Sequence, residues 1–435
     1  MIKSTRVRKL VASTSGLQKG LWVALLGVVL FVIGAGLSFK LLIVPLLSRL
    51  SLGTQWLVGF FLPAEQVETA THFLGGGLLF FGFYFAFVGA RLTVNHIVDT
   101  LNPGLKSGKV DIYLRKRQLS KGPRIVAIGG GTGLSTLLRG LKQHSSNITA
   151  IVTVTDDGGS SGKLVAEKGI IPPGDIRNCL VALADAEKAM TDLFQHRFGR
   201  NSGSLSGHSM GNLLIAALVD QAHGDFEKAI EIASDVLAIR GRVVPSTLTS
   251  AKLRAVVEGG AEIVGETAIV ESGHRIERIY LEPEGVEAYA AAIEAIESAD
   301  LICIGPGSVY TSIIPNLLVP GIAQALREAK VPKAYICNVM TQPGESDSFS
   351  ASEHVTAILN NVQKRVFDYV LVNTGAPSSL ALDKYRESGQ SFVEPDSDRI
   401  RAMGFRVLHG NYMSESDFVR HDPMKVAARL MGLLD

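Results

Sequence analysis

A glycine-rich segment directly follows a short β-branched run, an arrangement that is typical of a phosphate-binding loop. The segment comprises Gly129, Gly130, Gly131, Thr132 and Gly133. Glycines let the backbone approach a phosphate, and the helix expected after them offers unpaired N–H groups at the positive end of its dipole. Leu134 stands where a GxGxxG dinucleotide fingerprint has its third glycine. The segment therefore predicts phosphate or nucleotide binding without identifying a cofactor; a tight strand-to-helix turn is the simpler alternative.

Three acids and one base follow in the next two loops. Asp156 and Asp157 come after the second expected strand, whereas Asp175 and Arg177 lie at the start of an expected helix. An acid after the second strand suits a ribose hydroxyl, and paired carboxylates suit Mg²⁺ that bridges a diphosphate; a plain Asp-Gly turn is the alternative. Arg177 is the strongest candidate for a phosphate contact. The sequence establishes no metal site, but Asp156, Asp157 or Asp175 would hold Mg²⁺ if the protein uses it.

Further polar loops follow expected strands or precede expected helices. They supply the candidate binding residues His208, Asn212, Gly307, Ser308, Tyr310, Asn338, Thr341 and Asn373. An isolated histidine is more often a capping or core residue, but the glycines that flank His208 favour a binding role. So many polar loops at one edge of a sheet predict a single shared site.

Short apolar runs that alternate with helical stretches must position these loops. Strands are expected at residues 124–128, 148–155, 301–304, 333–337 and 369–372, and a helix is expected at about 134–141. This alternation predicts an α/β fold with a doubly wound, mostly parallel sheet and ligands at the carboxyl ends of its strands. Residues 256–281, where turn glycines separate alternating apolar positions, predict an antiparallel insertion.

The composition is that of a globular chain with an unusual front end. Its 435 residues are 46% hydrophobic and 19% charged, which excludes a disordered or collagen-like chain. Its three cysteines lack CxxC spacing and suit a reducing compartment. Residues 1–120 hold 13 Lys and Arg against 4 Asp and Glu, whereas the remainder holds 30 against 37. A basic, apolar segment before an acidic domain predicts a membrane anchor and argues against nucleic-acid binding.

Two uncharged runs, residues 21–39 and 73–90, are 19 and 18 residues long. As helices they match the ~30 Å hydrocarbon thickness, so we expect a transmembrane hairpin with membrane lipid as its partner; two buried core helices are the alternative. Glycines in the second run would let the two helices pack closely in a bilayer. Lys and Arg flank both outer ends of the hairpin. The positive-inside rule therefore predicts a multi-pass plasma-membrane protein whose termini and globular domain are cytoplasmic.

The predicted organisation has three parts: a hairpin at residues 1–100, a basic juxtamembrane linker at 101–122 and a globular nucleotide-binding domain at 123–435. The linker contains Arg115, Lys116 and Arg117 and would either rest on anionic lipid or be solvated. The apolar stretch 55–62 is too short to span a membrane. The sequence leaves open whether it enters the interface or extends a helix.

Six polar motifs of the C-terminal part occur in a recognisable order. They are GGGTGLS at 129–135, DDGGSSG at 156–162, PPGDIRN at 172–178, GHSMGN at 207–212, GPGSVYTSIIPNLL at 305–318 and NVMTQPGE at 338–345. They resemble the YvcK-type gluconeogenesis factor family, within the wider group that includes 2-phospho-L-lactate transferase (CofD). The resemblance extends over about residues 123–435 and leaves out the hairpin. It implies a Rossmann-like domain that binds UDP-sugars, especially UDP-N-acetylglucosamine, and supports cell shape and envelope synthesis under gluconeogenic growth.

The resemblance leaves two functions of different class open. One is a UDP-sugar-binding protein without turnover, since no reaction is established for the YvcK-type proteins as a family. The matching loops then imply that residues 130–133 approach the nucleotide near Asp156 and Asp157, while His208, Asn212, Gly307, Ser308 and Tyr310 line the rest of the cleft. The other is a Mg²⁺-dependent, CofD-like phosphoryl transferase. An NAD-linked dehydrogenase is disfavoured by the missing third glycine. The sequence identifies no protein partner and leaves a homodimer open.

Overall fold

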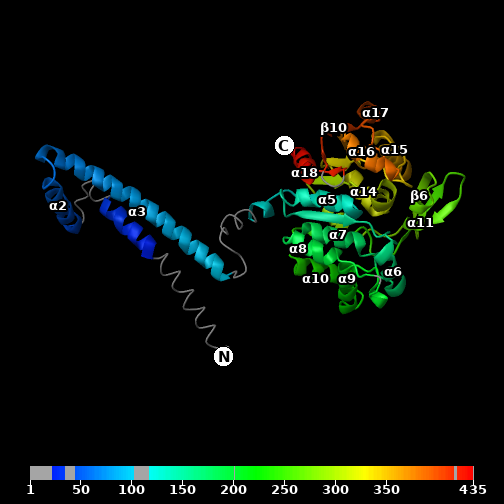
Figure 1. Cartoon of the computed structure of the whole chain (residues 1–435), viewed down its shortest axis with the longest axis horizontal. Coiled ribbons are helices and arrows are strands. Elements are labelled where there is room, and N and C mark those ends of the chain that lie inside the picture. The colour runs from blue at the N-terminus through cyan, green and yellow to red at the C-terminus, as the bar shows by residue number, and fades with distance from the viewer. Residues whose placement is uncertain (1–21, 35–44, 102–116, 200, 416–418, 435) are drawn as a thin grey trace. The chain divides into compact units, whose positions relative to one another are not determined.

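The computed structural model describes residues 22–34, 45–101, 117–199, 201–415 and 419–434. The chain forms two units, an N-terminal one that ends at Arg117 and a C-terminal one that begins at Gln118. The described part of the N-terminal unit is helical (Figure 1). Its helices are Trp22–Gly34, α2 (Pro45–Gly59) and α3 (Ala64–Leu101).

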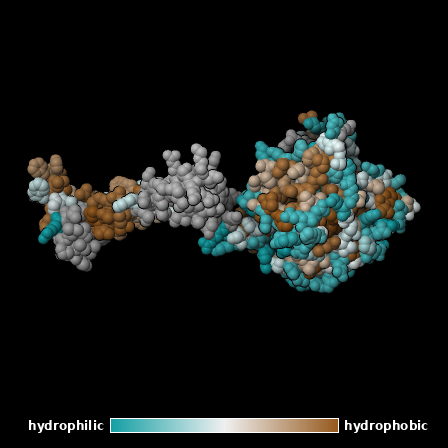
Figure 2. Space-filling model, turned by 90° about the horizontal axis from the view of Figure 1, so that it is seen from below, coloured by the Kyte–Doolittle hydropathy of each residue, from teal (hydrophilic) through white to brown (hydrophobic). Residues whose placement is uncertain are grey.

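The helix Trp22–Gly34 packs against α3 through glycines. A Cβ atom at Gly27 would lie 2.3 Å from the backbone N of Ala86, and one at Gly82 would lie 2.4 Å from the backbone N of Phe31. Close backbone approach of this kind is typical of helix pairs in membranes, where small residues line the contact. Large apolar side chains such as Phe80 of α3 remain exposed, and Figure 2 shows hydrophobic area over this unit. The described helices therefore leave much apolar surface uncovered.

One unbroken helical stretch among the described residues, Ala64–Val94 of α3, is long and apolar enough to cross a membrane. The expected second span, 73–90, lies inside it. Of the expected first span, 21–39, residues 22–34 form a helix, and the others lie outside the described residues. Residues Trp56–Gly59 form the end of α2, so this part of the apolar stretch 55–62 extends a helix.

A seven-stranded, entirely parallel sheet forms the centre of the C-terminal unit. Its strands, in spatial order, are β10 (Arg406–Gly410), β9 (Tyr369–Asn373), β8 (Lys333–Ile336), β7 (Leu301–Ile304), β1 (Ile125–Gly129), β2 (Ile148–Val152) and β3 (Arg242–Pro245). The strand order reverses direction at the β1–β7 pair. This confirms the predicted α/β fold with a doubly wound sheet, and it places a topological switch point between β1 and β7.

Helices cover both faces of this sheet (Figure 1). In β1, Ile125 and Ala127 pack into one apolar core, whereas Val126 and Ile128 pack into the other. Helices of the first core are α5 (Gly131–Leu141), α6 (Gly159–Lys168), α7 (Gly174–Leu183), α8 (Glu187–Gln195), α9 (Met210–Gln221), α10 (Phe226–Leu237) and α18 (Pro423–Met431). Helices of the second core are α11 (Glu266–Glu271), α12 (Ala290–Glu297), α13 (Ile314–Leu317), α14 (Pro320–Glu328), α15 (Ala351–Val362) and α17 (Ser397–Ala402). Burial on both faces explains why the central strands are continuous apolar runs.

Smaller elements complete the unit. An antiparallel sheet at residues 252–282 consists of β5 (Glu262–Val264), β4 (Lys252–Val257) and β6 (Ile276–Glu282), which confirms the expected insertion. The ribbon β11 (Met413–Glu415) and β12 (Val419–His421) packs with α16 (Ser379–Glu387). Short helical turns occur at Gly203–Leu205 and, with π-helical geometry, at Val309–Ile313.

Two expected boundaries differ by three residues from the structure. The strand β2 ends at Val152 and not at residue 155, and α5 begins at Gly131 and not near residue 134. The strands β3 and β10 were not expected from the sequence, and both lie at the edges of the sheet. Edge strands are buried on fewer sides, so β10 contains Arg406 and His409 and lacks the continuous apolar run of a central strand.

Candidate functional site

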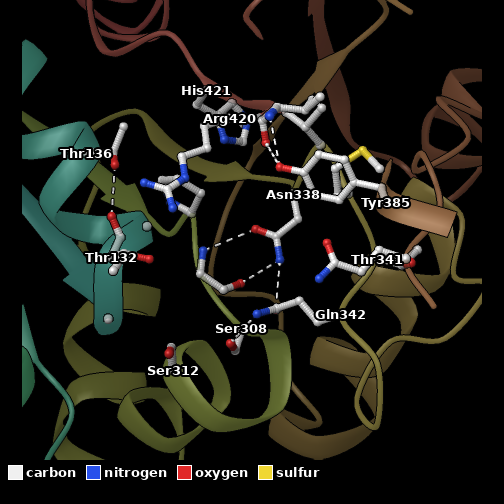
Figure 3. A pocket seen from close by; sticks show the side chains of 18 of the residues that line it. Thr132, Thr136, Ser308, Ser312, Asn338, Thr341, Gln342, Tyr385, Arg420 and His421 are labelled. Atoms are coloured by element: carbon white, nitrogen blue, oxygen red, sulfur yellow. Dashed lines mark hydrogen bonds between the residues drawn. The ribbon is translucent and has the colours of Figure 1, made fainter. Parts of the chain in front are cut away.

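A cavity of about 510 Å³ opens at the carboxyl ends of β1, β7 and β8, at the switch point of the sheet (Figure 3). We call it the polar pocket. Its lining residues are Gly130, Gly131, Thr132, Gly133, Thr136, Pro306, Gly307, Ser308, Ser312, Asn338, Val339, Met340, Thr341, Gln342, Lys384, Tyr385, Ser388, Gln390, Val419, Arg420 and His421. Lys384 and Arg420 bring positive charge to this lining, which contains no carboxylate. This chemistry favours an anionic ligand with several hydrogen-bonding groups.

The glycine segment forms the first turn of α5 and one wall of the polar pocket. Gly131 has φ of +62°, which glycine adopts without strain. A Cβ atom at Gly133 would lie 2.4 Å from the carbonyl oxygen of Pro306, so only glycine lets the two loops meet. The N–H groups of Thr132 and Gly133 have no acceptor within the helix, because they belong to its first turn. They offer an anion-binding position beside the cavity.

Asn338 connects the β7 and β8 loops on the opposite wall. Its Nδ2 donates to the carbonyl oxygen of Gly307 at 2.9 Å, and the N–H of Gly307 donates to its Oδ1 at 3.2 Å. Gln342 Nε2 donates to Ser308 Oγ at 2.7 Å (Figure 3). Thr341 is also buried, and its Oγ1 lies 3.2 Å from Ser391 Oγ. These hydrogen bonds hold the wall in one conformation. The remaining hydrogen-bonding positions of its amides and hydroxyls lie along the cavity.

The far wall comes from elements that the sequence did not mark as part of a site. α16 contributes Lys384 and Tyr385, and β12 contributes Arg420 and His421. Tyr385 is fixed by Val419, whose N–H donates to the tyrosine hydroxyl at 2.8 Å. Burial lowers the pKa of His421 to about 4, so this imidazole is neutral at pH 7. No motif spacing in the sequence relates these residues to the glycine segment. The only sequence feature that could have indicated their role is the presence of basic residues near the C-terminus, in a stretch without a recognisable motif.

A second group of predicted residues forms what we call the buried network: Ser160, Ser161, Asp175, Arg177, His208, Ser209 and Asn212. Arg177 is only 5% exposed. Its Nη1 donates to Ser209 Oγ at 2.5 Å and to Asn212 Oδ1 at 2.9 Å, and its Nη2 donates to Asn178 Oδ1 at 2.9 Å. Burial, with nearby Arg197, lowers the pKa of Arg177. Its hydrogen bonds therefore join loops of the protein.

The buried network also holds His208 and meets the glycine segment. His208 Nδ1 lies 3.1 Å from Ser160 Oγ, and the ring is buried. Asp175 accepts a hydrogen bond from the N–H of Gly131. Burial raises the pKa of Asp175 to about 7, and the charge of Asp156 acts in the same direction. Gly130 separates the two regions, because a Cβ atom there would lie 2.5 Å from Asp175 Oδ2.

Two further acids lie next to this network. Asp157 Oδ1 accepts from the N–H of Thr267 at 2.9 Å, so it fixes the start of α11. The adjacent Glu266 has its pKa raised to about 9, first by burial and then by the charges of Asp156 and Asp175. Asp156 Oδ1 accepts from the N–H of Gly158 at 3.0 Å. Mutual repulsion among these carboxylates would be relieved by protonation or by a cation.

Glu345 and Tyr310 lie along the π-helical turn. Glu345 Oε1 accepts from Thr311 Oγ1 at 2.9 Å, while its buried Oε2 has no partner among the described residues. Burial raises the pKa of Glu345 to about 7. Tyr310 is also buried; its hydroxyl approaches the carbonyl oxygen of Ile276 at 3.4 Å, and burial raises its pKa to about 12.

The structure thus distributes the predicted site residues over several positions at the carboxyl edge. The polar pocket is lined by Gly130, Gly131, Thr132, Gly133, Gly307, Ser308, Asn338 and Thr341. The buried network contains Asp175, Arg177, His208 and Asn212, with Asp156 and Asp157 beside it. Gly129, Tyr310 and Asn373 line neither; Asn373 Oδ1 accepts from the N–H of Tyr412 at 2.9 Å and so fixes a loop. Thr136, Ser312 and Gln342 are lining residues that were not predicted.

Metal binding has a limited basis in this geometry. Within the described part of the chain, no three His, Cys, Asp or Glu side chains are grouped to hold a metal ion. Mg²⁺ is commonly held by one or two carboxylates together with waters and phosphate oxygens. Asp156 and Asp175, whose carboxylates raise the pKa of Glu266, form a pair that would suit this mode.

Comparison with known proteins gives a consistent result. The family model described as 2-phospho-L-lactate transferase CofD matches residues 125–413. The gluconeogenesis factor of Bacillus subtilis is 47% identical over 313 residues, which cover 72% of this chain and 98% of that protein. A putative gluconeogenesis factor of Nostoc is 44% identical over 418 residues, which cover 95% of this chain and 90% of that protein. Because the Nostoc alignment covers 95% of this chain, it includes most of the N-terminal unit.

A solved structure resembles the C-terminal unit. The crystal structure of a upf0052 family member from Bacillus halodurans superposes with a TM-score of 0.69 at 44% identity. The match covers 72% of this chain and 99% of that chain. In that protein, therefore, a chain of about the size of the C-terminal unit folds without a counterpart of the rest.

Proposed function

The chain belongs to the CofD family and, within it, to the gluconeogenesis factors, and from this premise we propose that its polar pocket binds a UDP-sugar, UDP-N-acetylglucosamine before others, without turning it over. The protein would do so as a membrane-tethered factor that supports cell shape and envelope synthesis under gluconeogenic growth. The observation that carries the proposal is one cavity that joins a helix N-terminus, two cations and neutral hydrogen-bonding side chains.

The two ends of such a ligand need different surroundings. The diphosphate suits the first turn of α5, where the N–H groups of Thr132 and Gly133 are free of helical acceptors, together with Lys384 and Arg420. The uracil and the N-acetyl sugar suit amides and hydroxyls such as Asn338 and Gln342. The volume of about 510 Å³ falls within the usual range of small-molecule sites, ~300–1,000 Å³.

Tethering is supported by features of the N-terminal unit. α3 contains a stretch that is long and apolar enough to span, and a second apolar helix packs on it through glycines. The basic residues outside the two apolar runs favour cytoplasmic termini and a cytoplasmic C-terminal unit. Flotation of the full chain with vesicles in high salt, and protease accessibility of both termini in sealed vesicles, test the tether and its orientation.

Calorimetry tests the ligand. The full chain in detergent is titrated with UDP-N-acetylglucosamine, GDP and NAD, and each recovered ligand is chromatographed. We expect the uridine nucleotide to bind more tightly and to be recovered intact, because a site that pairs with uracil and the sugar leaves its own polar groups unpaired with the wrong ligand. Tight NAD binding would refute the assignment.

A second function, a Mg²⁺-dependent phosphoryl transferase, is favoured by one observation. The carboxylate of Asp175 lies beside the glycine segment and interacts with that of Asp156, and Mg²⁺ there would neutralise both and bind phosphate oxygens. In the same titrations, tighter GDP binding with Mg²⁺, and product formation with a deazaflavin acceptor, would move the assignment to this function.

A further inference from the structure

The amino ends of all seven strands share one edge of the sheet, because every pairing in that sheet is parallel. This edge is opposite to the one that carries the polar pocket. The chain enters the C-terminal unit at this same edge, since residues 118–124 lead directly into β1. The segment that connects the unit to the apolar helices is therefore attached on the side away from the polar pocket.

This amino edge is basic although the unit is acidic. From Gln118 onward the chain holds 30 Lys and Arg against 37 Asp and Glu, a net charge of −7. Six exposed cations lie in the residues just before, or at the start of, five of the strands: Lys121, Arg242, Lys330, Lys364, Arg365 and Arg406. We call them the basic edge. None of the six lies within 4 Å of a carboxylate in the described part of the chain.

Two carboxylates at this edge, which directly precede β7 and β9, are already paired with other residues. Asp300 Oδ1 pairs with Arg124 at 3.0 Å, and Asp368 Oδ2 pairs with Lys333 at 3.1 Å. The six cations thus form no ion pair among the described residues, along an edge that extends from β3 to β10. Like charges gathered on a unit of opposite net charge indicate a surface for an anionic partner.

The cations at the β10 end are held in position by aromatic rings. Arg365 stacks over Phe405 at 4.6 Å, and Arg406 lies 5.5 Å from the Tyr369 ring. Together with Lys330 these guanidinium groups line a shallow hollow of about 440 Å³, whose one acidic lining residue, Asp368, pairs with Lys333. Pre-positioned guanidinium groups with remaining N–H donors are suited to phosphate oxygens.

An anionic bilayer fits this arrangement better than a free phosphate. The six cations are spread over the edges of five strands, which matches an extended charged surface and not a single small ion. The edge is also continuous with the point where the chain arrives from the apolar unit, through a sequence that contains Arg115, Lys116 and Arg117. Basic residues next to a membrane-spanning helix are attracted to anionic lipid.

We propose that the basic edge rests on the anionic phospholipid surface of the membrane and thereby holds the C-terminal unit with its polar pocket opening away from the bilayer. This inference rests on the proposed tethering and adds to it an orientation and a lipid class. The ligand would then reach the polar pocket from the cytosol while the unit is docked, and the opposite edge would be covered by headgroups.

Amine acetylation of the full chain in nanodiscs tests the proposal. In discs that contain phosphatidylglycerol, Lys121, Lys330 and Lys364 should react at least about threefold more slowly than in discs of phosphatidylcholine alone, and salt should restore the rates. Lys384, in the polar pocket, is the control and should react equally in both. Equal rates for all four lysines in both discs would overturn the proposal, as would equal protection by inorganic phosphate in phosphatidylcholine discs.

A charge-reversal pair separates docking from tethering. The double variant Lys330→Glu, Lys364→Glu should abolish the lipid-dependent protection of Lys121. The control double variant Lys228→Glu, Arg386→Glu makes the same charge change on helices that begin at the carboxyl side of the sheet, and it should preserve that protection. Both pairs should float with vesicles in high salt and bind UDP-N-acetylglucosamine as the parent chain does. A parent chain that does not float refutes the tether itself; one that floats without protection refutes only the docked orientation.

Discussion

The buried network and the polar pocket lie at the same edge of one sheet, on either side of Gly130, but they use polar side chains differently. In the buried network, Arg177 is 5% exposed and donates hydrogen bonds to three side chains of the protein. In the polar pocket, Lys384 and Thr132 border open space. Polar groups that are satisfied internally stabilise the loops, whereas those that face a cavity are available to a ligand. Substitutions in the two regions should therefore affect different measurements.

The largest effect is expected from Arg177→Ala. Loss of the guanidinium leaves the buried Ser209 and Asn212 without this donor, and we expect the free energy of unfolding to fall by about 3–5 kcal/mol. Urea unfolding followed by far-UV circular dichroism measures this. Arg197→Ala removes an exposed arginine whose Nη1 donates to the carbonyl of Gly207, and should cost under about 1 kcal/mol. A stable Arg177→Ala chain that has lost only ligand affinity would contradict this difference between the regions.

Gly133→Ala should affect both stability and binding. The new Cβ would meet the Pro306 carbonyl, so either the β7 loop or the first turn of α5 must move, at a cost of about 1–3 kcal/mol in unfolding free energy. Calorimetry should also show weaker UDP-sugar binding, because that turn borders the polar pocket. Gly199→Ala, at an exposed glycine with nothing within 4 Å, should change neither quantity. Unchanged affinity in a folded Gly133→Ala chain would remove α5 from the ligand site.

Lys384→Gln should reduce affinity and leave stability unchanged. The lysine lines the polar pocket from α16, and its loss should weaken UDP-sugar binding by about 1–2 kcal/mol, the scale of a hydrogen bond to a charged group. Arg386→Gln, on the same helix but outside the lining, is the matched control. Titration calorimetry gives the affinities and thermal denaturation gives the stabilities. Equal affinities of the two variants would place the diphosphate elsewhere.

The smallest effect is a pH dependence in the acids beside the buried network. The pKa of Glu266 is raised to about 9 in the folded chain. In the unfolded chain its carboxyl has the ordinary pKa near 4.5, so between these two pH values only the folded chain keeps the proton. Stability from this group is present at low pH and is lost as the pH rises toward 9. Glu266→Gln should flatten the decline between pH 5 and 9, whereas Glu271→Gln on the exposed end of α11 should not. Parallel curves for the parent chain and Glu266→Gln would exclude Glu266 as a proton-binding group.

The central strands and the loops that follow them were predictable, because the sequence patterns that indicate them are local. An apolar run such as Leu301–Ile304 indicates a strand buried on both faces, and the glycines at its end indicate a turn, without knowledge of any neighbour. The edge strands β3 and β10 gave weaker signals, since a strand with one paired side requires fewer apolar residues. The same reasoning explains why the sequence drew attention to residues 130–133, which line the polar pocket.

Residue types and spacing by themselves thus determined the parallel α/β fold, the apolar helices of the front end and the glycine segment, because each depends on chain neighbours within about ten residues. Only the tertiary structure decided that Arg177 and His208 point into the buried network, while Lys384 and Arg420, from elements near the C-terminus, complete the polar pocket. Whether a polar side chain meets another protein group or open space depends on contacts between segments that lie far apart in the chain. No local pattern contains that information, since the same arginine type satisfies a buried loop at residue 177 and borders a cavity at residue 420.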